Sequence, residues 1–420
     1  MNAAFFSAYA DIEAHLDLLG MFHMDLRLER MRRVLAALKP GNAGARVQVV
    51  GTNGKGSTSV FLASLAAASG LSAGLFTSPH LASVRERIRL FCPQRGSFLL
   101  PESAWPDPAN AVMAAGGGSL TYFEFLTVLA VKVFADAGCD LAVFEAGLGG
   151  THDATTSLEK DVLCITPIGL DHEAVLGNTP EAVARDKAGA MRPGVPAFSA
   201  PQSSGVEAVL RECAQRAGAS LNMASPARKN LRLGLSGPHQ RLNAGLAVAA
   251  WRHLAETRGW KSDARVIGRG LSTAWLPGRL QLIPAGPGHP SLILDGAHNA
   301  HGLAALERAL PDLPQQPQSL VFCCMADKDL DSMLPLVRRI AARKPVFVPP
   351  VANCIRAMNP ADLAQSIGPN AIAAPSLAAA LTAAMPHGPA LMLGSLYMLG
   401  EFFILWPEYL DMDSAGLKQS

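Results

Sequence analysis

Short apolar runs alternate with stretches of helical periodicity over the first half of the chain. The apolar runs predict strands at 46–50, 72–76, 140–145 and 161–166, and the periodic stretches predict helices at 57–68, 121–136 and 179–191. Such alternation is typical of an α/β fold with a mostly parallel sheet. Residues 92–118 are rich in proline and glycine, so we expect an irregular surface connection there.

A second alternating series follows an alanine-rich helix expected at 243–256 and a punctuated link at 275–279. Its predicted strands are at 291–295, 319–324, 345–348 and 390–394, and its predicted helices are at 300–310, 330–342, 360–367, 376–385 and 397–405. Two α/β lobes joined near residue 276 would leave a cleft between them, and clefts between domains are favoured ligand sites.

The composition fits a large globular protein. The 420 residues are 49% hydrophobic and 17% charged, enough for a large core and for two or three domains. A formal net charge of +2 argues against a general polyanion-binding surface, so we expect no nucleic acid partner. Seven cysteines include no C-x-x-C pair, which disfavours a disulfide framework and a zinc site and favours a reducing cytoplasm. The acidic start of the chain disfavours a secretory signal.

The apolar run 389–406 raises the question of a membrane span, because about 20 apolar residues cross a bilayer. Gly394, Gly400 and Glu401 interrupt the run. We therefore expect a buried strand, a turn and an amphipathic helix, with a membrane span as the alternative.

The segment Gly51-Thr-Asn-Gly-Lys-Gly-Ser-Thr58 lies between a predicted strand and a predicted helix. Its glycines allow the backbone N–H groups to converge on a phosphate, and Lys55 adds a cation. The hydroxyl of Ser57 or Thr58 could bind Mg²⁺. Gly56 separates the lysine from these hydroxyls, unlike the ordinary P-loop. The alternative is a glycine-rich turn with a solvated lysine.

Two further polar groups end predicted strands, where open α/β sheets bind their ligands. Glu145 enters a glycine-rich turn and is a candidate Mg²⁺ ligand, with a surface glutamate as the alternative. Asp171 and His172 are a second candidate, and a structural histidine is an equally good interpretation. Residues 295–299 and 327–329 repeat this placement in the second lobe.

Two predicted helices carry less certain candidates near their starts. Lys187 lies about two turns into a helix opened by Thr179 and Pro180, and helix geometry alone favours a solvated lysine. Residues 238–243 bring imidazole and amide groups to the start of a helix, where a capped loop is an equally good interpretation.

Together these motifs resemble folylpolyglutamate synthase, including its bifunctional dihydrofolate synthase form, within the Mur ligase superfamily. The resemblance covers residues 10 to 405, approximately. The motifs, in family order, are 51–57, 77–81, 86–88, 121–125, 145–150, 153–155, 169–172, 186–189, 239–240, 243–244, 277–279, 295–299 and 327–329.

The resemblance implies an enzyme of two domains with its catalytic site in the cleft between them. Residues 1–276 would form a P-loop-type central ATPase domain, and residues 277–420 a smaller Rossmann-like ligase domain. The implied reaction is ATP-dependent addition of L-glutamate to folates, and also to dihydropteroate, through an acyl phosphate. The expected enzyme is a cytoplasmic monomer with small-molecule substrates and no membrane partner.

The resemblance also implies roles for individual residues. Lys55, His172 and Lys187 would be catalytic, with Lys187 carbamylated. Ser57 would bind a first Mg²⁺, and Glu145 and His172 a second. The expected nucleotide-binding residues are Thr52, Asn53, Gly54, Lys55, Gly56, Ser57, Thr58, Asn243, Arg279, Asp295 and His298. The expected substrate-binding residues are Ser78, Pro79, His80, Tyr122, Phe123 and Asp153.

The chain departs from the family pattern after Gly150. The family commonly has an arginine and an asparagine around its Asp-Ala-Thr motif, where this chain has Thr151 and Thr156. Three rival functions are a Mur-type ligase acting on a cell-wall precursor, a P-loop kinase, and a nucleotide-binding regulatory protein without catalysis.

Overall fold

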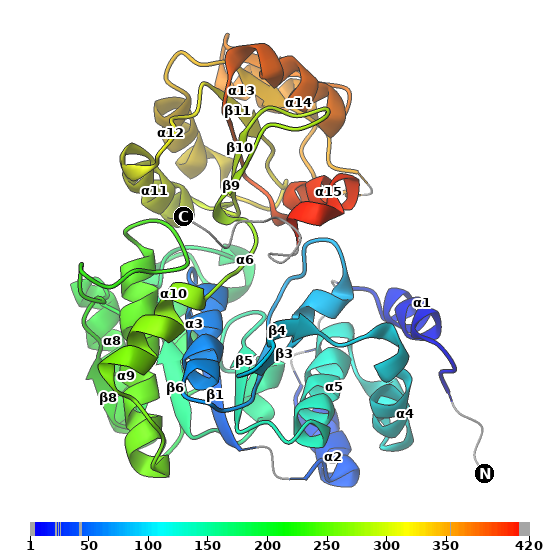
Figure 1. Cartoon of the computed structure of the whole chain (residues 1–420), viewed down its shortest axis with the longest axis vertical. Coiled ribbons are helices and arrows are strands. Elements are labelled where there is room, and N and C mark those ends of the chain that lie inside the picture. Colours follow the sequence, from blue (N-terminus) through cyan, green and yellow to red (C-terminus); the bar gives the residue numbers. More distant parts are fainter. Residues whose placement is uncertain are drawn as a thin grey trace.

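Two β-sheets, each covered by helices, form two lobes that lie one above the other in Figure 1. The structure, a computed structural model, describes residues 5–21, 23, 25, 27–41, 44–352 and 354–410. The first sheet has the order β4-β3-β2-β5-β1-β6-β7-β8 and the second β13-β12-β11-β14-β10-β9. Neighbouring strands are parallel except at β2–β3, β3–β4 and β9–β10. The expected α/β class with a mostly parallel sheet is confirmed.

The first lobe holds the longer sheet. Its strands are β1 (Ala45–Val50), β2 (Ala73–Phe76), β3 (Ile88–Cys92), β4 (Gly96–Leu99), β5 (Leu141–Glu145), β6 (Val162–Ile165), β7 (Ala197–Ser199) and β8 (Leu221–Met223). Its helices are α1 (Tyr9–Leu19), α2 (Glu29–Leu38), α3 (Lys55–Ala68), α4 (Pro106–Ala114), α5 (Tyr122–Asp136), α6 (Glu173–Leu176), α7 (Pro180–Ala188), α8 (Ser204–Ala217), α9 (Gln240–Arg258) and α10 (Ala264–Thr273).

The second lobe repeats the alternation on a smaller scale. Its strands are β9 (Arg279–Ile283), β10 (Leu292–Asp295), β11 (Ser319–Phe322), β12 (Val346–Val348), β13 (Ala371–Ala373) and β14 (Ala390–Leu393). Its helices are α11 (Ala300–Ala309), α12 (Leu330–Ala341), α13 (Pro360–Ile367), α14 (Leu377–Ala384) and α15 (Leu396–Leu405).

Side-chain alternation along the strands divides the core between the two faces of each sheet. In β1, Val47 and Val49 pack with α3, α9 and α10, whereas Val50 packs with α7 and α8. In β5, Phe144 faces the opposite side from Val143 and packs with α5. The strands are therefore buried on both faces, as parallel sheets require.

The predicted strands and helices are confirmed, with shifts of up to three residues at their ends. The interpretation of residues 92–118 as irregular is wrong, because this stretch holds β4 and α4. Pro106 and Pro108 do not prevent the helix, since proline is tolerated in the first turn, where N–H groups have no helical partner. Trp105 precedes α4 and is fully buried against Tyr9.

The run 389–406 forms β14, a turn and α15, as expected. In the part of the chain that the structure describes, none of the helices combines the length and apolar character needed to cross a bilayer.

We predict that Trp105→Ala lowers the free energy of unfolding by about 3–5 kcal/mol, because it leaves a cavity between α1 and α4. Urea denaturation would measure the loss. Phe5→Ala is the control, since this side chain is 58% exposed and should change stability by less than about 0.5 kcal/mol. Equal losses for both variants would contradict the assigned burial.

Candidate active site

A cavity of about 670 Å³ lies between the two lobes, at the carboxyl ends of β1, β2, β5, β10 and β14. Most of the residues singled out from the sequence line it: Thr52, Asn53, Gly54, Lys55, Gly56, Ser57, Ser78, Pro79, Tyr122, Phe123, Glu145, Asp153, His172, Lys187, Asn243, Arg279, Asp295 and His298. Thr58 and His80 lie behind its wall instead: Thr58 is fully buried within α3, and His80 contacts Arg87.

The phosphate-loop candidate wraps tightly around the start of α3. Gly54 has φ 87°, and a Cβ there would lie 2.2 Å from Asn243 Oδ1, so only glycine fits. Lys55 is the first residue of α3, and its Nζ donates to the Thr52 carbonyl at 3.2 Å. The helix N-terminus and the lysine thus present positive potential to the same part of the cavity.

Glu145 is buried at the end of β5, against this loop. Its Oε2 accepts a hydrogen bond from the Ser78 N–H at 3.2 Å, and a Cβ on Gly56 would lie 3.4 Å from the same oxygen. Burial raises the pKa of the Glu145 carboxyl, although nearby Lys55 and the Ser78 amide oppose the rise. A cation beside the carboxyl group would stabilise its charged form, and a bound metal ion would be such a cation.

Asp171 and His172 differ in their surroundings. Asp171 accepts hydrogen bonds from Lys328 Nζ at 2.6 Å and from Asn299 Nδ2 at 2.9 Å, both in the second lobe. Despite burial, His172, Lys328 and His298 hold the pKa of Asp171 well below its usual range. Enclosure by the protein lowers the pKa of His172 to about 4, so its neutral imidazole could bind a metal ion. Both oxygens of Asp171 accept hydrogen bonds from residues of the second lobe.

Lys187 is buried on α7, with 4% of its surface exposed. The solvated lysine favoured by helix geometry alone is therefore wrong. Burial, followed by the charge of Lys55, lowers the pKa of Lys187 to about 7. The neighbouring Asp186 Oδ2 accepts from the Gly150 N–H at 2.9 Å, which joins α7 to the turn after Glu145.

The candidate nucleotide residues of the second lobe are held by backbone contacts. Asp295 accepts hydrogen bonds from the N–H groups of Leu280 and Ala297 at 3.0 and 2.9 Å. His298 Nδ1 lies 2.7 Å from the Gly296 carbonyl, and Arg279 Nη1 donates to the Gly278 carbonyl at 3.1 Å.

Polar contacts also join the two lobes directly across the cavity. Asn53 Nδ2 donates to Asn299 Oδ1 at 3.0 Å and lies 2.8 Å from His301 Nδ1. These contacts connect the phosphate loop to the start of α11. The capped-loop interpretation of residues 238–243 is wrong, because α9 begins at Gln240 without a side-chain cap; Asn243 Nδ2 donates to Gln240 Oε1 at 2.8 Å within the helix, and both residues line the cavity.

The candidate substrate side contains a buried cation that the sequence analysis did not single out. Arg87 is 3% exposed, lies 5.3 Å from the centre of the Tyr122 ring and donates through Nε to His80 Nδ1 at 3.0 Å. No carboxylate in the described part of the chain lies within ion-pair distance of it. Its place in the motif at 86–88 was the available signal. Lys328, His239 and Tyr397 also line the cavity.

Asp153 stabilises the turn that follows Glu145. Its carboxylate accepts from the N–H groups of Gly147 and Leu148 at 2.8 and 3.0 Å, and from the N–H and hydroxyl of Thr155. These four bonds use the acceptor positions of both oxygens. Substrate binding by Asp153 stays a prediction.

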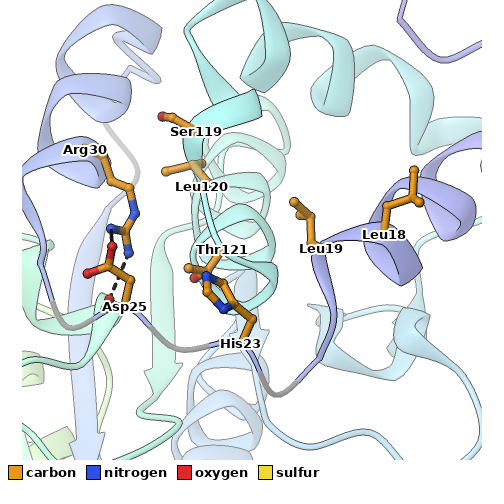
Figure 2. Close-up of a pocket in the computed structure, with 8 residues that line it drawn as sticks. All are labelled: Leu18, Leu19, His23, Asp25, Arg30, Ser119, Leu120 and Thr121. Atoms are coloured by element: carbon orange, nitrogen blue, oxygen red, sulfur yellow. Dashed lines mark hydrogen bonds and ion pairs between the residues drawn. The ribbon is translucent and has the colours of Figure 1, made fainter.

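A second cavity of about 490 Å³ adjoins the first, and His23, Asp25 and Thr121 line both. Figure 2 shows Arg30 beside Asp25 on the side of α2, with His23 and Thr121 near the start of α5. Arg30 forms ion pairs with Asp25 and Glu124, so its charge is already compensated.

Comparisons with known proteins agree with this geometry. Residues 278–389 match the model of the Mur ligase, glutamate ligase domain. The dihydrofolate synthase/folylpolyglutamate synthase of Bacillus subtilis is 31% identical over 80% of this chain and 84% of its own length. The chain spans about half to three fifths of the length of several longer curated relatives.

Solved structures share the whole fold. E. coli FolC, in complex with DHPP and ADP, is 30% identical with a TM-score of 0.84, covering 96% of this chain and 98% of that one. A bifunctional folylpolyglutamate synthase/dihydrofolate synthase with Mn, AMPPNP and L-glutamate bound is 29% identical with a TM-score of 0.82, covering 97% of this chain and all of that one. The resemblance found in the motifs is confirmed, and the chain belongs to the dihydrofolate synthase/folylpolyglutamate synthase family.

Proposed function

We propose that this protein is an ATP-dependent ligase that adds L-glutamate to folates and to dihydropteroate. The observation that carries the proposal is the meeting of Lys55, Glu145 and Lys187 beside a phosphate loop, in a cavity shared by both lobes. The nucleotide, DHPP and L-glutamate named for the related structures support the same substrates here. This function is favoured over a cell-wall ligase, a kinase and a regulatory protein.

The phosphates of ATP would lie against residues 51–57, where backbone N–H groups, the α3 N-terminus and Lys55 converge. Asn243 lies beside Gly54 on one side of this loop. Arg279, Asp295 and His298 would contact the nucleotide from the second lobe.

We propose that the cavity binds two Mg²⁺ ions, because Ser57, Glu145 and His172 all line it. Ser57 would hold the first ion, and Glu145 with His172 the second. Within the described ranges, no three His, Cys, Asp or Glu side chains gather as a ready-made metal centre. Mg²⁺ usually takes only one or two protein ligands beside phosphate oxygens and waters. When bound, the ions would neutralise charge on the phosphates.

Lys187 is proposed to be carbamylated. A buried lysine whose pKa is lowered to about 7 has a substantial fraction of uncharged amine near neutral pH, and an uncharged amine can add to carbon dioxide with release of a proton. The product would place an anion, in place of the amine, beside the proposed metal ligands.

The chemical problem is that a carboxylate is a poor electrophile. Its attack on the γ-phosphate of ATP would give an acyl phosphate and ADP, and attack by the amine of glutamate would then release phosphate. Lys55 would neutralise charge that develops on the transferred group.

The acid substrate would be oriented by Ser78, Pro79, Tyr122 and Phe123. Arg87 could bind a carboxylate of this substrate, since its Nη groups have no anionic partner.

We also propose the division into domains at residues 276 and 277, where the chain passes from α10 to β9. A cytoplasmic location is also proposed, because the seven scattered cysteines include no C-x-x-C pair and fit a reducing compartment. A monomer is proposed from the family resemblance alone.

We predict that Lys55→Ala lowers kcat at least 10²- to 10³-fold, because a cation at the transferred phosphate is lost. ADP formation that depends on both glutamate and the acid substrate would measure it. Lys229→Ala, a change at an exposed lysine outside the cavity, should leave activity unchanged. Normal turnover by Lys55→Ala, with a thermal melt equal to that of the wild type, would contradict the proposed role.

We predict that Lys187→Ala lowers kcat by roughly 10²-fold or more and that added acetate restores part of it. The substitution leaves room for a small carboxylate in place of the proposed carbamate. Lys55→Ala provides the control, because acetate cannot replace a cation. Failure of acetate to raise kcat at any concentration, in a folded variant, would argue against an anionic group at this position.

A further inference from the structure

A chain of buried polar side chains runs behind the cavity wall, on the α7 side of β1. Lys160 precedes β6, and its Nζ donates to Gln48 Oε1 and, at 2.9 Å, to the Ala190 carbonyl beyond α7. Gln48 is 2% exposed, in β1. Neither Lys160 nor Gln48 lines the cavity, and the mechanism proposed above uses neither.

The hydrogen bonds in this chain share one direction, which starts at the Lys160 amine. Burial lowers the pKa of Lys160 to about 7, but an amine or an ammonium at Nζ can donate to Gln48 Oε1, and this contact leaves both Gln48 N–H groups for Thr155 and Thr156. The Gln48 NH₂ group then donates to Thr155 Oγ1 and Thr156 Oγ1, each at 2.7 Å. Both hydroxyls are left to donate onward.

Those two onward bonds end on the turn after Glu145. Thr155 donates to Asp153 Oδ1 at 2.5 Å, and Thr156 donates to the Gly150 carbonyl at 2.6 Å. The Asp153 carboxylate in turn accepts from the N–H groups of Gly147 and Leu148. The network therefore fixes both ends of the turn 147–150, of which residues 147–149 line the cavity. A Cβ on Gly147 would lie 2.9 Å from the ring of Phe123, so the turn packs against the expected acid-binding side.

The same lysine holds α7. Ala190 lies three residues after Lys187, and the Lys160–Ala190 bond ties the end of that helical segment to β1. Thr151 adds a second tie, because its hydroxyl donates to the Asp186 carbonyl at 2.8 Å. Side chains that do not line the cavity thus fix the position of the turn 147–150 relative to α7.

We propose that Lys160 and Gln48 are positioning residues for the acid-binding side of the cavity. They set the donor direction of Thr155 and Thr156 and so fix the turn 147–150 against Asp153. This inference rests on the proposed function for its kinetic consequence, but its structural consequence is independent of any activity.

The first test replaces Gln48 by glutamate, which keeps the size of the side chain and removes its two donors. Glutamate can accept from Lys160, but Thr155 and Thr156 must then donate to it and lose their bonds to Asp153 and Gly150. In the full-length Gln48→Glu protein, we expect hydrogen exchange of the amides in 147–156 to quicken roughly tenfold, with the exchange of β11 and α12 unchanged. Exchange equal to that of the wild type would overturn the inference.

The second test replaces Lys160 by methionine and by arginine. Lys160→Met should raise KM for the folate or dihydropteroate substrate roughly five- to tenfold while KM for ATP stays within about twofold, because the phosphate loop makes no bond to the network. Lys160→Arg should restore much of the effect. Lys132→Met, at a lysine paired with Asp136 on α5, is the matched control and should change neither KM.

The kinetic split separates positioning from a general loss of stability. A merely structural role would reduce the amount of active enzyme, and with it the apparent kcat, but would leave both KM values unchanged. That result for Lys160→Met would overturn the inference. If the wild type itself shows no glutamate-dependent ADP formation, the proposed function fails, and the exchange experiment with Gln48→Glu still decides whether the network fixes the turn.

Discussion

The candidate active site depends on one electrostatic constraint, which is that charged side chains lie out of reach of bulk water at the edge of the first sheet. Glu145, Lys187 and Arg87 are each no more than 5% exposed. Burial of a charge is costly unless an opposite charge or hydrogen bonds offset it. Here burial raises the pKa of Glu145 and lowers the pKa of Lys187 and of Arg87. A cavity with such walls favours ligands that bring complementary charge, as phosphates, divalent cations and carboxylates do.

The backbone conformation allows these charged groups to lie close together. Gly56 separates Lys55 from Ser57, a spacing absent from the ordinary P-loop, and a side chain at this position would press against the Glu145 carboxylate and against Leu276. The extra glycine therefore allows a carboxylate to approach the start of α3. Leu276, in the link to β9, packs against the same hydrophobic core as α3.

The sequence predicted the strands and the residues at their ends well, because the carboxyl ends of parallel strands must share one edge. Glu145 and Asp295 end β5 and β10 and follow from that rule, whereas His172 lies beyond the end of β6 and the rule left a structural histidine as an equally good interpretation. The sequence pattern did not predict α4, because the stretch 92–118 is rich in proline. Pro106 and Pro108 fall in the first turn of α4, where proline is tolerated. The sequence pattern also missed the burial of Lys187 and Arg87, since long side chains are buried by elements distant in sequence. The partnership of Lys160 with Gln48 joins residues 112 positions apart, and no local pattern indicates it.

The hydrogen bonds of the first lobe explain how the two residues that depart from the family pattern are accommodated. Thr151 and Thr156 stand where the family commonly has arginine and asparagine, and both hydroxyls bond to backbone carbonyls of the first lobe. A threonine hydroxyl can accept one bond while it donates another, which suits Thr156 to relay the direction set by Gln48. An arginine at 151 could only donate and would bring a further cation toward Lys187, where burial already disfavours positive charge. The shorter, neutral side chains thus close the turn from within the lobe and add no charge to a cavity that Lys55, Glu145, Lys187 and Arg87 already line.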